Sequence, residues 1–139
     1  MPSPKIADKQ KAILDASVEV FASRGFWDTP TSLISKTAGI ADGTLFTYFK
    51  TKDDLIHQVY LELKRELADC LLAGLDEHES VQDKMRHIWN EYVGWGVQNP
   101  EKFKVLHQIE SSYKLDEQVK AVAHEPFIEV ERITDESIA

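Results

Sequence analysis

Apolar residues recur at helical spacing along almost the whole chain, and this pattern limits the fold more than any other feature. No segment alternates apolar and polar residues as a strand would, and neither a hairpin turn nor an internal repeat interrupts the pattern. The sequence therefore predicts an all-α fold. In residues 5–24, for example, one helical face is formed by Ile13, Leu14, Ser17, Val20 and Phe21.

Glycine, proline and capping residues predict where the helices begin and end. Gly25 is expected to end the first helix. Thr29 is expected to cap the second, with Pro30 as its first residue. The pair Asn99-Pro100 separates two later helices, and Pro126 should kink or split the last segment. The predicted helices are residues 30–38, about 42–50, 53 to about 75, 81–98 and 100 to about 112, with a last segment from near residue 115.

Composition limits the cellular setting. The chain has 139 residues, a net charge of −8, and a single cysteine, Cys70, which fits a reducing compartment. No signal peptide and no apolar run long enough for a membrane span is present, so we expect a cytoplasmic protein with no membrane partner. Residues 1–52 carry +2 and the remainder −10. This asymmetry fits either a polyanion-binding end or scattered surface charge.

Residues 29–52, TPTSLISKTAGIADGTLFTYFKTK, predict two short helices joined by a tight turn. Gly39 permits a left-handed backbone, and Ile40 fills the angle between the helices. Leu45 and Phe49 lie four residues apart and should face inward. The opposite side then presents small and hydroxyl-bearing residues, with two lysines nearby, and such groups hold phosphate oxygens. The pattern indicates a helix-turn-helix, whose second helix can enter a DNA major groove.

These residues also resemble a known family. The stretch ILDASVEVFASRGF, together with TPTSLISKTAGIADGTLFTYFKTKDDL, is similar to the DNA-binding domain of the TetR (tetracycline-repressor) family of transcriptional regulators. The resemblance covers residues 10–55. It implies an N-terminal three-helix DNA-binding domain (residues 1–52) and a helical ligand-binding and dimerisation domain (residues 53–139) that we expect to be truncated. It also implies a homodimer that binds double-stranded palindromic operator DNA and is released by a small, largely apolar inducer.

The resemblance assigns DNA contacts to individual positions. For Tyr48 a purely packing role is the alternative, and Asp42 is ambiguous because its charge suits a helix N-terminus but repels phosphate. Two positions depart from the family pattern: Ala41 stands where a capping serine is common, and Phe46 where a tyrosine is common. Phe46 is therefore left out of the set. The implied DNA-binding residues are Thr31, Ser32, Asp42, Gly43, Thr44, Thr47, Tyr48 and Lys52.

In the body, residues 81–98 and 100–112 each carry an apolar face with polar groups in it. A plain helix-bundle core is one interpretation and a ligand pocket is the other. His107 and Glu110 within an apolar face need partners, and could satisfy each other or line a pocket. Gly94 and Gly96 should leave room beside Trp95. The predicted ligand-binding residues are Met85, Trp89, Tyr92, Val93, Phe103, His107 and Glu110.

No motif of catalysis or metal binding is present. The five histidines lack HExxH spacing, and neither a P-loop nor a GxGxxG pattern occurs. We therefore predict no catalytic residues, no metal and no cofactor. The leading hypothesis is a ligand-responsive DNA-binding repressor. The alternative is a helical small-molecule-binding protein whose DNA binding is weak or lost, which Asp42 and Phe46 would favour.

Overall fold

Three helices form the N-terminal part of the computed structural model, which describes residues 4–138. They are α1 (Pro4–Arg24), α2 (Thr31–Ala38) and α3 (Asp42–Tyr48), and α2 packs against both of the others. Ile34 of α2 and Leu45 of α3 are fully buried between them. We call α1 to α3 the N-terminal unit.

Gly39 makes the turn between α2 and α3. Its φ of 73° and ψ of 33° place it in the left-handed region, where a side chain would be strained. The Gly39 N–H donates to the Lys36 carbonyl (3.1 Å), and the Ile40 N–H donates to the Ser35 carbonyl (3.0 Å). These two bonds end α2 and set the direction of α3.

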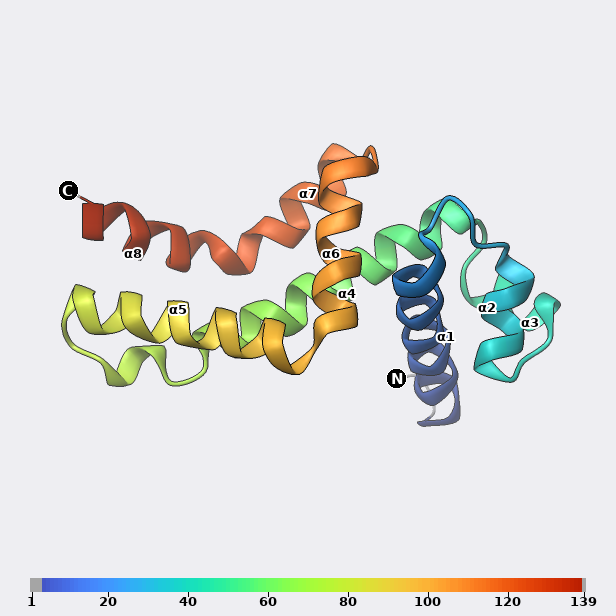
Figure 1. Cartoon of the computed structure of the whole chain (residues 1–139), viewed down its shortest axis with the longest axis horizontal. Coiled ribbons are helices and arrows are strands. Elements are labelled where there is room, and N and C mark those ends of the chain that lie inside the picture. The colour runs from blue at the N-terminus through green and yellow to red at the C-terminus, as the bar shows by residue number, and fades with distance from the viewer. Residues whose placement is uncertain (1–3, 139) are drawn as a thin grey trace.

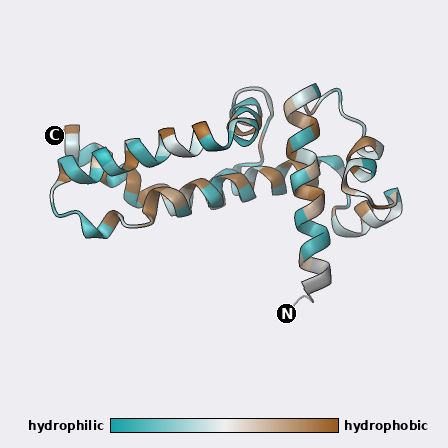
Figure 2. Ribbon diagram, turned by 60° about the horizontal axis from the view of Figure 1, so that its bottom comes forward, coloured by the Kyte–Doolittle hydropathy of each residue, from teal (hydrophilic) through white to brown (hydrophobic). Residues whose placement is uncertain are grey.

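The rest of the described chain, which we call the body, is built around the long helix α4 (Lys52–Leu72). In Figure 1, α5 packs against α4 and α8 runs beside α5, whereas α6 crosses α4 steeply beside α1. Hydrophobic and hydrophilic residues are interspersed along these helices, as Figure 2 shows. The other elements of the body are η1 (Leu75–Glu77), α5 (Val81–Gln98), α6 (Pro100–Ser112), α7 (Glu117–His124), η2 (Glu125–Phe127) and α8 (Ile128–Ile138).

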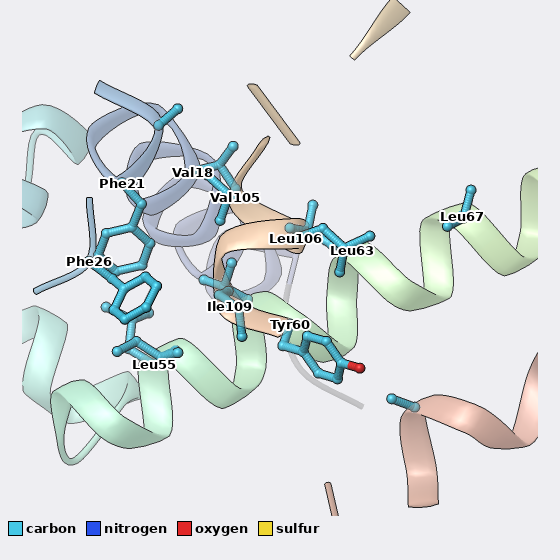
Figure 3. Packing of buried hydrophobic residues seen from close by; sticks show 14 of the residues in the cluster. Val18, Phe21, Phe26, Leu55, Tyr60, Leu63, Leu67, Val105, Leu106 and Ile109 are labelled. Atoms are coloured by element: carbon cyan, nitrogen blue, oxygen red, sulfur yellow. The ribbon is translucent and has the colours of Figure 1, made fainter. Parts of the chain in front are cut away.

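A single buried cluster joins the N-terminal unit to the body, with side chains from α1, α4 and α6 (Figure 3). Phe26, directly after α1, meets Tyr113 at the end of α6 with ring centroids 5.4 Å apart. The Tyr113 hydroxyl donates to Asp53 in the first turn of α4. Lys104 of α6 donates to the carbonyl of Ala22 in α1 (2.7 Å). We call this contact region the junction.

The predicted helix positions are largely confirmed. The structure reproduces residues 81–98 as α5, and η2 with Pro126 separates α7 from α8. The second short helix ends at Tyr48, two residues earlier than expected, because Phe49 takes an extended conformation that turns its ring into the core. The long helix ends at Leu72 instead of near residue 75, because Gly74 is left-handed and redirects the chain.

Thr29 does not cap α2, contrary to the prediction. Its hydroxyl donates to the Gly25 carbonyl (2.6 Å), and the side chain is buried at 1% exposure. The residue before α2 is Pro30, and no side-chain cap bond is formed there. Thr29 therefore closes the link between α1 and α2 across the glycine that ends α1.

Replacing Thr29 with valine should lower the free energy of unfolding by about 1–3 kcal/mol, because the Gly25 carbonyl loses its buried donor. Urea denaturation measures this change. Thr37→Val is the matched control, since the Thr37 hydroxyl makes the same type of bond to Leu33 (2.8 Å) at an exposed site. Equal effects of the two substitutions would show that burial of the Thr29 bond is unimportant.

Candidate DNA- and ligand-binding sites

The outer face of α3 consists of short or hydroxyl-bearing residues. Gly43 and Thr47 are exposed, Thr44 is half-buried, and Leu45 on the opposite face is fully buried. The Thr47 hydroxyl donates to the Gly43 carbonyl (2.9 Å), and its oxygen can still accept a bond. Gly43 has nothing within 4 Å of the position that a Cβ would occupy. A backbone or base edge could therefore approach this part of the helix closely.

Four further predicted DNA-binding residues lie on α2 and α3. Ser32 is exposed in the first turn of α2, next to the half-buried Thr31. Asp42 is exposed in the first turn of α3. Tyr48 is half-buried and packs against the core cluster, which favours the packing role that was its alternative.

Lys52 opens α4 and is also half-buried. Burial lowers its pKa, and the negative charge of Asp28 opposes that shift. The preceding residue, Thr51, caps α4: its hydroxyl oxygen accepts from the Asp54 N–H (3.0 Å). Sequence analysis did not assign this cap, although Thr at the residue before a helix with Asp at its third position is the typical signal. Thr51 fixes the start of the helix and so the position of Lys52.

A cavity of about 310 Å³ lies among α4, α5, α6, η2 and α8 of the body. This volume is at the lower end of the range for small-molecule sites, roughly 300–1,000 Å³. Its walls are largely apolar, with Leu67 and Leu71 from α4 and Leu106 from α6. Five of the seven predicted ligand-binding residues line the cavity: Met85, Trp89, Tyr92, His107 and Glu110.

Two predicted ligand-binding residues lie outside this cavity. Val93 is 42% exposed on the outer side of α5. Phe103 packs behind the wall, with its ring centroid 4.3 Å from that of His107 and 6.0 Å from that of Tyr92. A Cβ on Gly96 would come within 3.1 Å of the Phe103 ring. The space beside Gly96, which we expected to be open, is therefore filled by Phe103.

The polar groups of the cavity lie at its solvent side. His107 and Glu110 are exposed, contrary to the expectation that they are buried in an apolar face. His107 Nε2 lies 3.3 Å from the Tyr92 hydroxyl. Burial, together with the charge of Glu110, raises the pKa of Tyr60 to about 12 and raises that of Tyr92 as well. Both tyrosines therefore stay protonated at neutral pH and can act as donors.

A smaller cavity of about 160 Å³ lies between α1, α4 and α6, and most of its charged residues already form ion pairs. Lys102 and Glu66 form an ion pair (2.8 Å) across it. Arg65 pairs with Glu62 along α4 (3.7 Å). We regard the 310 Å³ cavity, with its largely apolar walls, as the candidate ligand site.

Other kinds of site receive no support from the geometry. In residues 4–138, no group of three or more His, Cys, Asp or Glu side chains is arranged to hold a metal ion. Within the same range, every helix is too short or too polar to cross a membrane.

Comparison with known proteins identifies the N-terminal part. Residues 13–59 match the sequence model of bacterial regulatory proteins of the tetR family. The segment includes all of α2 and α3 and the start of α4. The matched segment belongs to the TetR family.

Individual TetR-family proteins agree with this assignment. The fatty acid metabolism regulator protein of Bacillus subtilis (strain 168) is 34% identical over 84 residues, which are 60% of this chain and 43% of that protein. The match thus spans less than half of the relative's length. A TetR family regulator from Marinobacter aquaeolei VT8 has the same fold, with a TM-score of 0.90 at 21% identity over 97% of this chain and 71% of that one.

The third comparison is with a protein that was crystallised with a ligand. FadR from Bacillus subtilis, crystallised in complex with stearoyl-CoA, superimposes with a TM-score of 0.70 at 22% identity, over 88% of this chain and 65% of that one. The first relative is named as a regulator, and the other two as transcriptional regulators. The prediction that the chain is not an enzyme agrees with these names.

Proposed function

We propose that this TetR-family chain is a ligand-responsive transcriptional repressor that acts in the cytoplasm. In this proposal the N-terminal unit binds operator DNA, and the body binds a small, largely apolar inducer that releases it. The observation that carries the DNA-binding part is the outer face of α3. Gly43 and Thr47 are exposed there, next to a buried Leu45, within the segment that matches the family.

The residues proposed to contact DNA have distinct tasks. Lys52 and the hydroxyls of Thr31 and Thr47 suit phosphate oxygens, which position the protein without reading sequence. Ser32, Gly43, Thr44 and Tyr48 remain the proposed base or backbone contacts on α2 and α3. Asp42 can contribute only by accepting from a cytosine amino group.

The small reading surface supports the proposal of a homodimer. α3 contains only seven residues and can cover a few base pairs. Two copies of the unit, about 34 Å apart, would read a palindrome over successive turns of DNA. Exposed apolar side chains at the C-terminal side of the body support a self-association surface: Val122 is 52% exposed, Ile128 56% and Ile138 79%.

The inducer is proposed to bind in the 310 Å³ cavity, whose largely apolar walls favour an apolar ligand. The stearoyl-CoA complex of FadR supports this choice, since the acyl chain of that ligand is apolar. Val93 and Phe103 do not line the cavity, so they would not contact an inducer bound there.

The second candidate, a ligand-binding protein with weak or lost DNA binding, is favoured by one observation. Asp42 is exposed at the start of α3, where its charge would face the phosphates. Titration of the chain with duplex DNA at two salt concentrations separates the candidates. Binding that weakens steeply as salt increases supports the first, and no measurable binding at low salt supports the second.

Lys52→Ala should weaken binding to all duplexes about equally, because it removes one phosphate contact. It should also make the slope of log binding constant against log salt concentration shallower by roughly one unit. Thr44→Ala should instead change the preference between operator and unrelated DNA. Fluorescence anisotropy over a salt series measures both effects. An unchanged slope for the lysine variant would contradict the phosphate contact. Both alanine variants should melt at the same temperature as the unaltered chain, which confirms that they are folded.

A further inference from the structure

Lys64 of α4 is the cationic side chain at the wall of the 310 Å³ cavity, and it is half-buried. Its ammonium nitrogen lies 4.3 Å from the centre of the Phe127 ring in η2. A ring face attracts the charge but accepts no conventional hydrogen bond. The N–H groups that point away from the ring therefore need an acceptor from water or from a ligand.

The sequence around Lys64 gives it no ionic partner on its own helix. The positions three and four residues away are Tyr60, Leu61, Leu67 and Ala68. Among residues 4–138, no carboxylate oxygen lies within 4.0 Å of the Lys64 ammonium. The neighbouring Arg65, by contrast, pairs with Glu62 at 3.7 Å.

The opposing charge at this cavity is Glu110, on α6. Its side chain is exposed, so water screens its charge and compensates for the lack of a partner. Glu110 faces the two tyrosines, Tyr60 and Tyr92, whose pKa values it helps to raise. Lys64 instead lies against Phe127 and the leucines of the wall, where water has less access.

We propose that the cavity binds an amphiphile with an anionic headgroup, which Lys64 holds while the apolar chain packs against the leucine side chains of α4 and α6. This inference rests on the proposed ligand-binding function and adds the charge of the ligand. A carboxylate and a phosphate monoester share the required chemistry. A charge-assisted hydrogen bond at such a site should strengthen binding about ten- to hundredfold over an uncharged analogue.

Calorimetric titration of the full chain with decanoate, decyl phosphate, decanol and decylamine tests the proposal, since these probes share the alkyl chain and differ in the headgroup. We expect decanoate or decyl phosphate to bind at least about tenfold more tightly than decanol. The tighter of the two anions identifies the headgroup. Decylamine should bind more weakly than decanol, because Lys64 repels it.

Lys64→Met retains the length and apolar stem of the side chain but removes the charge. It should reduce anion affinity to that of decanol, while decanol itself binds within about threefold of its affinity for the unaltered chain. Arg65→Met is the matched control, because Arg65 is on the same helix but does not line this cavity, and it should leave the anion preference intact. Circular dichroism and thermal melting confirm that both variants are folded.

Three results would overturn the inference. Equal binding of decanol and the anions would leave the apolar pocket in place and remove the role of Lys64. A preference for decylamine that Glu110→Gln abolishes would assign the headgroup to the opposite charge. Binding of none of the four probes would reject both the headgroup site and the proposed pocket.

Discussion

Replacing Phe26 with alanine is expected to lower the free energy of unfolding by about 3–5 kcal/mol, because a large aromatic side chain is removed from the junction. Phe26 is 3% exposed and meets Phe21 and Tyr113 edge-to-face, at centroid distances of 6.4 and 5.4 Å. The ring therefore connects α1 to the end of α6. Urea denaturation monitored by circular dichroism measures the loss.

Phe46→Ala is the matched control, with the same change in side chain at a site that is 43% exposed on α3. It should change stability by no more than about 0.5 kcal/mol. Comparable losses for the two variants would mean that the junction contributes no more to stability than a surface position.

Replacing Val130 with tryptophan is expected to weaken operator binding by about 5- to 150-fold without altering the DNA-contacting face. Val130 of α8 lines the 310 Å³ cavity, and the larger side chain would occupy the space proposed for the inducer. Packed helices shift as rigid bodies, so filling the cavity should displace α4 and α6 together. Anisotropy titration with an operator duplex, after folding and oligomeric state are confirmed, measures the effect.

The path for this effect passes through two continuous helices. α4 runs from Lys52 at the N-terminal unit to Leu71 at the cavity, about 30 Å at 1.5 Å per residue. α6 has the cavity residue Leu106 in its middle, and Tyr113 at its end is bonded to Asp53. A displacement at the cavity therefore reaches the start of α4 by both helices.

Val93→Trp controls for the added bulk, because Val93 is on α5 but outside the cavity. This variant should bind operator and ligand normally. If Val93→Trp releases DNA while Val130→Trp does not, the inducer site is not the 310 Å³ cavity. If both retain full affinity, the coupling between cavity and DNA-binding unit is absent.

The fold could be predicted because its signals are local. Helical spacing can be read from the sequence itself. Gly25, Gly39 and Pro100 each act through the backbone of a few neighbouring residues, so no knowledge of distant contacts is needed. The two errors at helix ends have distant causes. Phe49 leaves α3 to fill the core, and Leu75 is drawn into the core beyond Gly74.

The cavity could be predicted only in part, because periodicity identifies an apolar face but not what covers it. Trp89 and Val93 of α5 lie beside the buried Ile88, yet they are 65% and 42% exposed. Lys64 was missed for a similar reason: its partner ring, Phe127, is far away in sequence and comes close only through the fold. The DNA-binding roles stay predictions. Four of the eight residues are exposed (Ser32, Asp42, Gly43 and Thr47), and four are half-buried (Thr31, Thr44, Tyr48 and Lys52).

The division of contacts among different residues of α6 and the residue after it has a consequence for how such regulators diversify. Leu106, His107 and Glu110 line the cavity, whereas Lys104 and Tyr113 bind α1 and the start of α4. Lys104 precedes the cavity residues in α6, and Tyr113 follows the last residue of that helix, so a substitution at a cavity residue need not remove the contacts to α1 and α4. Duplicated genes could thus acquire new chemical signals by changing a few cavity residues, while the same mechanical connection to DNA is inherited unchanged.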